Sequence, residues 1–298
     1  MISINAFDQS ELNAVLGFWQ SLHPDCTWLS DREQVSEMLS EDEDIKRDDY
    51  VVRSEQDIIA TVFTKVLRRR GWMPTRFLYA EVGTAALGFR WLESLLEKIR
   101  EIDKGRSDTW HLINIEQEML CILQPILESS GFFQHSRVLR SEWKGEFVRA
   151  TELAQVLLER YSGGSFETDQ AIVTLHECAF HQSRFAAPLC IPRLWKPWPG
   201  QQSREYVLGW NNNCLVGFAE WALVGGAAAI TNVAVAPSWQ GLGLAKTIAA
   251  RAMQIILRDG HRSILATTQS NNTASLTTQN KLGWQVSREL AYTFVRVL

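Results

Sequence analysis

Residues 240–245 read Gln-Gly-Leu-Gly-Leu-Ala and have the types and spacing of a phosphate-binding turn. They follow an alternating apolar segment, 230–236, and lead into a segment with an apolar residue at every fourth position: Leu244, Ile248, Ala252 and Ile256. A helix that begins in such a turn leaves its first main-chain N–H groups uncovered, and glycine lets an anion approach them closely. The helix dipole adds about 0.3–1 kcal/mol, so the run predicts binding of a phosphate or pyrophosphate.

Two common phosphate-binding patterns do not fit this turn. A dinucleotide fold needs G-x-G-x-x-G and an acidic residue about twenty positions later. Here Ala245 follows the paired glycines, and the acidic residue would be Asp259, at the end of the expected helix. A P-loop, G-x-x-x-x-G-K-S/T, does not occur in the sequence. The run instead resembles the Gln/Arg-x-x-Gly-x-Gly/Ala loop of the GNAT superfamily of acyl-CoA-dependent N-acyltransferases.

A second stretch supports this resemblance independently. Residues 271–284 look like the GNAT helix that begins near an asparagine, here Asn272, and ends in Gly-Phe, here Gly283-Trp284. A short strand at 263–268 is expected between the two helices. Asn272 also suits a helix N-cap and Gly283 a helix C-cap, roles that are compatible with the resemblance. The resemblance covers about 146–298.

The resemblance implies that acetyl-CoA binds where two parallel strands splay apart. Main-chain groups of the fourth strand would pair with the pantetheine, and the Val235 N–H would stabilise the oxyanion of the transition state. The turn would cradle the pyrophosphate. The implied coenzyme-binding residues are Val233, Ala234, Val235, Gln240, Gly241, Leu242, Gly243, Leu244, Ala245, Asn272 and Ser275.

The sequence departs from the family at the general acid. The position four residues before Gly283 often holds a tyrosine that protonates the departing thiolate, but here it is Gln279, which cannot act as an acid. We expect Tyr292 on the last strand to replace it, with Ser275 and Thr278 as alternatives, unless the thiolate leaves unassisted. As general base we expect Glu220 on the third strand, with His176, Glu177 and His181 as alternatives. The two histidines are five positions apart, which does not suit a helical zinc site, so no metal is expected.

The acceptor side is less specific. Residues 184–202 contain four prolines and the tryptophans Trp195 and Trp198, which is typical of an ordered loop. The tryptophans could line the acceptor cleft or pack against the other half of the chain. The acceptor is expected to be a primary amine of a small molecule or a peptide.

Composition narrows the class of protein. The chain has 298 residues, 46% hydrophobic and 21% charged, with a net charge of −4, which predicts a soluble protein of two domains without affinity for nucleic acid or membranes. The five scattered cysteines, without Cys-x-x-Cys, favour reduced thiols. Residues 1–5 lack a signal-peptide pattern. We therefore expect a cytoplasmic monomer or homodimer.

The chain also repeats itself. Residues 50–67 align without a gap on 206–223, each reading as strand, polar turn, strand. A strand, a helix, a strand, a helix and Gly131-Phe132 follow in the first copy, in the same order as in the second, where the pair is Gly283-Trp284. The expected fold is α/β (α+β), with two tandem GNAT-like domains, 1–143 and 146–298, each a mixed twisted sheet flanked by helices. The second domain would open with a strand near 146–150.

The first copy lacks the chemistry of the second. Where the second copy has its glycine turn, residues 82–88 of the first read Val-Gly-Thr-Ala-Ala-Leu-Gly, without the paired glycines. We expect a degenerate domain there and an active one at 146–298. The predicted function is N-acetyl transfer from acetyl-CoA. Two alternatives are a non-catalytic acyl-CoA sensor, which the loss of the acid would permit, and an aminoacyl-tRNA-dependent ligase, which would lack the glycine turn.

Overall fold

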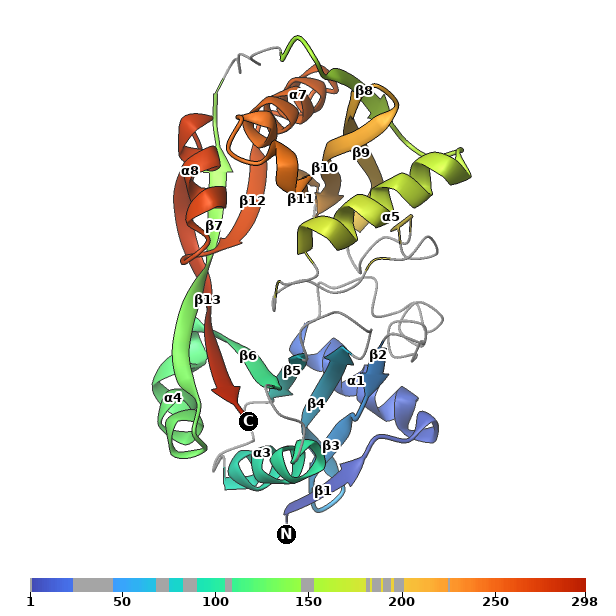
Figure 1. Ribbon diagram of the computed structural model, residues 1–298. Helices are drawn as coiled ribbons and strands as arrows, with labels where there is room; N and C mark the ends of the chain where they lie inside the picture. The colour runs from blue at the N-terminus through green and yellow to red at the C-terminus, as the bar shows by residue number, and fades with distance from the viewer. Residues whose placement is uncertain are drawn as a thin grey trace. The chain divides into compact units, whose positions relative to one another are not determined.

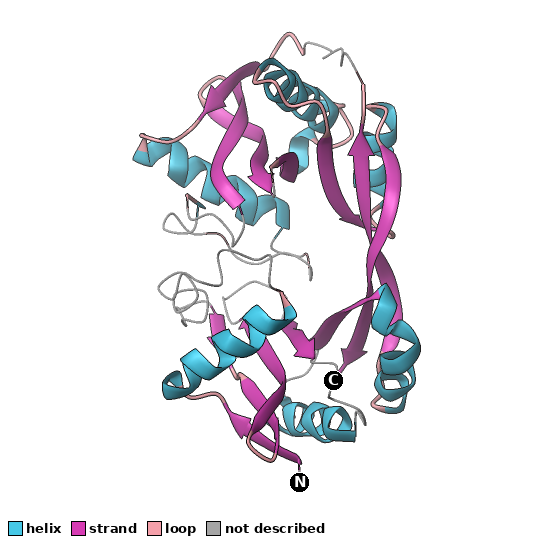
Figure 2. Cartoon of the chain, turned by 180° about the vertical axis from the view of Figure 1, so that it is seen from behind, coloured by secondary structure: helices cyan, strands magenta, loops and turns pink. Residues whose placement is uncertain are grey.

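The computed structural model describes residues 2–23, 45–67, 75–82, 90–104, 109–145, 153–180, 183, 189, 194–195, 201–224 and 226–298 (Figure 1). The chain forms two compact units, the first made of 1–136 with 291–298 and the second of 137–290. Each is an α/β unit with a mixed sheet between helices, as the sequence predicted (Figure 2). Among the described residues, no helix is long and apolar enough to cross a membrane.

The second unit contains a sheet in the order β8-β9-β10-β11-β12-β7, in which only β11 and β12 run parallel. One face packs on α5 and the other on α7 and the residues after α8. The elements are β7 (Phe133–Trp143), β8 (Leu157–Tyr161), α5 (Phe166–Phe180), β9 (Gln201–Asn211), β10 (Cys214–Val224), β11 (Ala227–Val235), α7 (Leu244–Arg258), β12 (Ile264–Gln269), α8 (Thr273–Lys281) and β13 (Gln285–Val297).

The predicted helical stripe is confirmed in α7, where Leu244, Ile248, Ala252 and Ile256 are all buried. The helix lies close to the sheet because glycine faces it there. A Cβ at Gly217 of β10 would stand 2.5 Å from Ile248 Cδ1. Burial of this stripe, at roughly 25 cal/mol per Å² of apolar surface, fixes the helix that carries the glycine turn.

The first unit repeats this arrangement with the strand order β1-β3-β4-β5-β6-β13, and β2 pairs with β4. Only β5 and β6 run parallel. Helix α1 packs on one face, and α3 and α4 on the other. The elements are β1 (Ile2–Ala6), α1 (Leu12–Leu22), β2 (Ile45–Arg47), β3 (Tyr50–Ser54), β4 (Asp57–Leu67), β5 (Thr75–Val82), α3 (Arg90–Asp103), β6 (Trp110–Glu116) and α4 (Leu120–Ser129).

The two units do not follow one another simply along the chain. Residues 138–143 of β7 pair with β12 and belong to the second unit, whereas residues 291–297 of β13 pair with β6 and belong to the first. The sequence predicted a boundary at Lys144-Gly145, but the contacts divide the chain inside β7 and inside β13. The strand expected at 146–150 lies outside the described residues, and the first strand of the second copy that the structure describes is β8.

The repeat is present in the structure, but its register differs by one residue from the gapless alignment. The hairpin turn follows Ser54 in the first copy and Asn211 in the second, and the extra residue of the adjacent bulge is Ile59 in one and Val216 in the other. Both comparisons give an offset of 157, whereas the alignment of residue 50 with residue 206 gives 156. A shift of one residue exchanges the two faces of a strand, so the structural offset is the one that matches inward-facing positions.

A buried polar cluster distinguishes the core of the first unit. Arg76 on β5 is fully buried and donates to both carboxylate oxygens of Asp103 on α3, at 2.6 and 2.9 Å. His111 on β6 lies between Asp103, 3.0 Å from Nε2, and Arg296, whose Nη2 donates to Nδ1 at 2.9 Å. Arg296 also donates to the carbonyl oxygens of Leu96 and Ser130. The end of β13 is therefore anchored in the first unit by hydrogen bonds as well as by strand pairing.

Candidate functional site

The parallel strands of the second unit splay apart at the position that the sequence predicted. Strands β11 and β12 pair only from Ala228 and Ile264 to Ile230 and Ala266. Beyond this point β11 continues to Val235 without a β12 partner. A bulge at Thr231 interrupts the pairing of β11 with β10, since Glu220 is opposite Asn232 and the next residue, Trp221, is opposite Ile230. A bulge bends a strand locally, so it accounts for the divergence of β11 from β12.

The open side of β11 exposes peptide groups to this notch. The Ala236 N–H donates to the Val216 carbonyl oxygen on β10, at 2.9 Å. Peptide groups alternate along a strand, so the N–H groups of Val233 and Val235 point the opposite way, toward β12. The Val235 carbonyl oxygen accepts a hydrogen bond from Gln240 Nε2 at 3.2 Å. Two N–H groups of the predicted pantetheine strand, including that of Val235, therefore face the notch.

The glycine turn has the geometry of an anion site. Gly241 and Gly243 have φ of 79° and 84°, in the left-handed region that favours glycine, and Gly243 caps α7. No atom lies within 4 Å of a Cβ built at either glycine, so neither is there for packing. Among the described residues, the main-chain N–H groups of 241–245 have no main-chain acceptor. Leu242 is exposed, whereas Leu244 is buried in the core beneath α7.

The second predicted helix begins as expected. The Asn272 side chain caps α8 by accepting a hydrogen bond from the Ser275 N–H at 3.1 Å. Ser275 Oγ in turn accepts from Gln279 Nε2 at 3.2 Å. The Gln279 Oε1 is buried and has no hydrogen-bond partner among the described residues. The helix thus presents an amide oxygen, and no acid, at the position that often holds tyrosine.

Glu220, the predicted base, lies on the α5 face of β10, beside the bulge. Its side chain is on the same face as Phe218, a member of the α5 core, and burial raises the pKa of the carboxyl group. Arg204 of β9, which was not predicted as a site residue, is its ionic partner, with Nη1 3.4 Å from Glu220 Oε1. A signal was available: Arg204, Tyr206 and Leu208 are alternate residues of the strand and so share one face, and a charge buried on that face needs a partner.

Tyr292, the predicted acid, lies on the part of β13 that belongs to the first unit. It is opposite Ile115 of β6 and packs against the core of the first unit, so the structure gives it no support as the acid of the second unit. The sequence placed it on the last strand correctly, but not in the sheet to which that part of the strand belongs.

The alternative residues have structural partners. His176 is buried in α5 with its ring 4.9 Å from Phe180. Trp195 Nε1 donates to Asp169 at 2.9 Å, and its ring packs edge-on against Tyr161 and Tyr206. Trp195 therefore packs against the α5 core of its own unit, whereas His181 and Trp198 lie outside the described residues. No group of three or more possible metal ligands occurs among the residues described.

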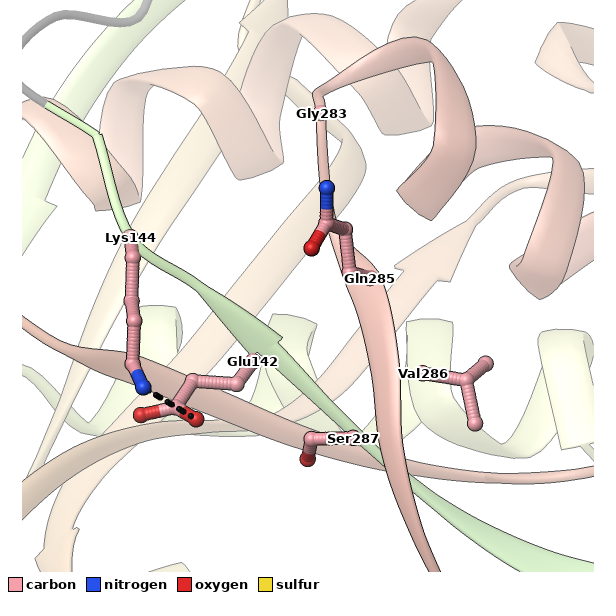
Figure 3. A pocket seen from close by; sticks show the side chains of 6 residues that line it. All are labelled: Glu142, Lys144, Gly283, Gln285, Val286 and Ser287. Atoms are coloured by element: carbon pink, nitrogen blue, oxygen red, sulfur yellow. Dashed lines mark ion pairs between the residues drawn. The ribbon is translucent and has the colours of Figure 1, made fainter.

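An open hollow of about 200 Å³ lies at the start of β13, lined by Glu142, Lys144, Gly283, Gln285, Val286 and Ser287 (Figure 3). Glu142 is already satisfied there, since it pairs with Lys144 at 3.2 Å and accepts from Ser263 Oγ at 2.7 Å. The hydrogen bond from Ser263 lowers the pKa of Glu142. None of the predicted coenzyme or catalytic residues lines this hollow, so it is separate from the candidate site.

Comparison with known proteins agrees with this geometry. Residues 170–284 match the family model described as the acetyltransferase (GNAT) family. No curated protein matches the sequence. A tandem GNAT protein from the clavulanic acid biosynthesis pathway superposes with a TM-score of 0.67 at 12% identity, covering 100% of this chain and 98% of its own.

Two further structures have the same fold. A GCN5-related N-acetyltransferase from Sphaerobacter thermophilus superposes with a TM-score of 0.63 at 15% identity, with 99% of this chain and 95% of the other covered. A probable N-acyltransferase from Enterococcus faecalis V583 gives 0.63 at 10% identity, with coverage of 100% and 72%. The second unit therefore belongs to the GNAT acetyltransferase superfamily, and the chain as a whole has the fold of tandem GNAT proteins.

Proposed function

We propose that the second unit transfers the acetyl group of acetyl-CoA to a primary amine of a small-molecule or peptide acceptor. The observation that carries this proposal is the notch beside β11. It combines a splayed parallel pair, inward N–H groups at Val233 and Val235, and a glycine turn with uncovered N–H groups. These are donors for the pantetheine and for a pyrophosphate, at one edge of the same sheet.

In this proposal, different residues around the notch act as general base, stabilise the oxyanion and help to protonate the thiolate. The acceptor amine gives up a proton, directly or through a water, to Glu220, whose carboxylate binds a proton more readily because burial raises its pKa. The amine nitrogen forms the new bond to the acetyl carbon while the Val235 N–H stabilises the oxyanion. The C–S bond then breaks and CoA leaves as thiolate, while the second proton of the attacking nitrogen passes to solvent. The thiolate takes a proton from solvent, directly or relayed through the Ser275 hydroxyl. Gln279 holds Ser275 by its hydrogen bond.

An acyl-CoA sensor without catalysis is the second candidate, and one observation favours it. Gln279 occupies the position that often holds the acid and has a buried oxygen without a partner among the described residues. A sensor would bind acetyl-CoA in the same notch and release no thiol.

Release of CoA thiol separates the two functions. The protein is incubated with acetyl-CoA and a broad panel of amines, and free thiol is followed against a blank without amine. The transferase predicts amine-dependent release, and calorimetry should give one acetyl-CoA per chain. Coenzyme binding without release by any amine would favour the sensor, and the binding of two coenzymes per chain would contradict the assignment of one active unit.

A further inference from the structure

A buried ion pair beside the notch leaves hydrogen-bonding capacity unused. Arg204 and Glu220 are 6% and 5% exposed, and the shortest distance between their charged groups is 3.4 Å. The Arg204 Nε is buried and has no hydrogen-bond partner among the described residues. The guanidinium and the carboxylate thus interact by charge. The Tyr206 hydroxyl also interacts with Arg204, and the Thr231 hydroxyl with Glu220, but none of these contacts uses the Arg204 Nε.

Other arginines of the molecule show what a saturated pair looks like. Arg76 grips Asp103 with two hydrogen bonds, through Nε and Nη2. Arg160, in the second unit, grips Glu205 in the same way, at 2.5 and 2.8 Å. This fork geometry uses the Nε that Arg204 leaves open. Since buried polar groups are almost always hydrogen-bonded, the open Nε of Arg204 calls for an acceptor atom that the described residues do not supply.

The position of the pair connects it with the proposed chemistry. Glu220 is opposite Asn232, next to the bulge at Thr231 where β11 begins to leave β12. Arg204 lies on β9 in register with Ala222 of β10, two residues along the same face from Glu220. A ligand lying across these two strands from the notch would meet the carboxylate first and the guanidinium second.

We propose that Arg204 and Glu220 together select an acceptor that carries a carboxylate close to its amine, as an α-amino acid does. The acceptor's ammonium group would bind Glu220, to which it gives its proton, and its carboxylate would bind the Nε side of Arg204. This proposal rests on the proposed transferase function and names the acceptor class of the same site. A ligand with one charge of each sign satisfies both buried groups without leaving either side chain unpaired.

Matched pairs of amines test the proposal. Phenylalanine is compared with phenethylamine, lysine with cadaverine, and histidine with histamine, by release of thiol from acetyl-CoA. In at least one pair we expect the amino acid to have a kcat/KM roughly ten- to a hundredfold above that of its decarboxylated partner, as for a charge-assisted hydrogen bond. Equal or better use of the decarboxylated amines throughout would overturn the proposal while leaving the transferase function intact.

Variants of Arg204 test whether this residue causes the preference for the amino acid over its decarboxylated amine. Arg204→Gln should remove the preference for the amino acid, and Arg204→Lys should remove part of it, because lysine keeps the charge but not the forked donors. Arg160→Gln is the matched control in the same sheet and should keep the preference. The affinity for acetyl-CoA and the melting temperature are measured for each variant, so that a folding defect is recognised. A preference that survives both Arg204 variants would overturn the proposal.

Direct binding keeps the test independent of turnover. Calorimetry of the same pairs is performed with the protein loaded with CoA. If Arg204→Gln weakens amino-acid binding at least tenfold, the proposed acceptor site is supported, whether or not thiol is released. The absence of thiol release would count against the transferase function only. If no member of any pair binds and none is acetylated, the proposed acceptor class is wrong.

Discussion

The two units have the same order of strands and helices, and each contains one parallel pair, β5 with β6 in the first unit and β11 with β12 in the second. The units differ at both ends of this pair, the end where the strands splay apart and the end where they are hydrogen-bonded. In the second unit, the open end has a bulge at Thr231 and a turn with two left-handed glycines. In the first unit, β5 pairs with β4 from Arg76 to Val82 without a bulge, although β5 and β6 also part beyond Leu78. The first copy of the turn, 83–89, lies outside the described residues, and its sequence lacks the paired glycines.

The two units also differ where their parallel strands are still paired, and here the first unit is the one with polar side chains. The second unit packs Ala228, Ile230, Ile264 and Ala266 into an apolar core there. The first unit places the Arg76, Asp103 and His111 cluster at the corresponding pairing, 75–78 with 110–113. The splayed strands are therefore common to both units, whereas the bulge and the glycine turn occur in the second unit, where we propose the coenzyme site. The first unit uses its polar groups for anchoring the chain end.

The largest expected effect is on the polar cluster. Asp103→Ala leaves Arg76 and His111 without their shared carboxylate, and removing one partner of a buried pair costs about 3–5 kcal/mol. The free energy of unfolding, measured by denaturant titration, should fall by that amount. Glu101→Ala, which removes a surface pair with Lys104, should change it by under about 1 kcal/mol. Equal effects of the two substitutions would contradict the role assigned to the cluster.

The next largest effect is on stabilisation by acetyl-CoA, and it should differ between the glycine turn of the second unit and residues 82–88 of the first copy. Gly243→Asp puts a carboxylate at the phosphate position and a side chain in left-handed backbone, whereas Ala86→Asp changes the first copy. Acetyl-CoA at a hundred times its Kd should stabilise the unmodified protein by about 2.7 kcal/mol. Thermal shift should show that gain abolished by Gly243→Asp and retained by Ala86→Asp. Loss of the gain in both variants would mean that the first copy also takes part in coenzyme binding.

A smaller effect depends on pH. Burial lowers the pKa of His111, which faces Asp103, Arg76 and Arg296. The unfolded chain therefore binds a proton more readily, so the stability contributed by neutral His111 is complete above about pH 6.5 and is lost as pH falls below it. The loss approaches about 1.4 kcal/mol per pH unit. Titration of unfolding free energy between pH 8 and 5 should show this slope, and His111→Gln should flatten it. An unchanged slope in that variant would assign it to other groups.

The smallest effect is expected at Gln279. If the amide gives up no proton, Gln279→Ala should lower turnover by less than about tenfold, or under roughly 1.4 kcal/mol of barrier. Tyr292→Phe should also have a small effect, because Tyr292 packs in the core of the first unit. Steady-state thiol release with one accepted amine measures both variants. A hundredfold loss in Tyr292→Phe with normal acetyl-CoA affinity would restore Tyr292 as the acid.

The sequence alone determined the elements whose signals are local. The apolar stripe of α7, the left-handed glycines of its turn, the Asn272 cap and the strand-helix order of both copies all depend on residues within about one helical turn or one hairpin. The proposed coenzyme site consists largely of such elements, and this explains why its residues could be predicted without a structure.

Tertiary structure decided what depends on sheet order and burial. The end of β13, and Tyr292 with it, belongs to the first unit and not, as the sequence had suggested, to the second. The repeat has an offset of 157 residues instead of the 156 of the gapless alignment, and Arg204 pairs with Glu220. These features have no local sequence signal, because strand partners are determined by pairing between residues far apart in the chain. The offset of the repeat is also hard to predict, since a strand buried on both faces keeps almost the same hydrophobic pattern when it is shifted by one residue. The proposed acceptor side depends on these long-range contacts, so the pairing of Arg204 with Glu220 emerged only from the folded sheet.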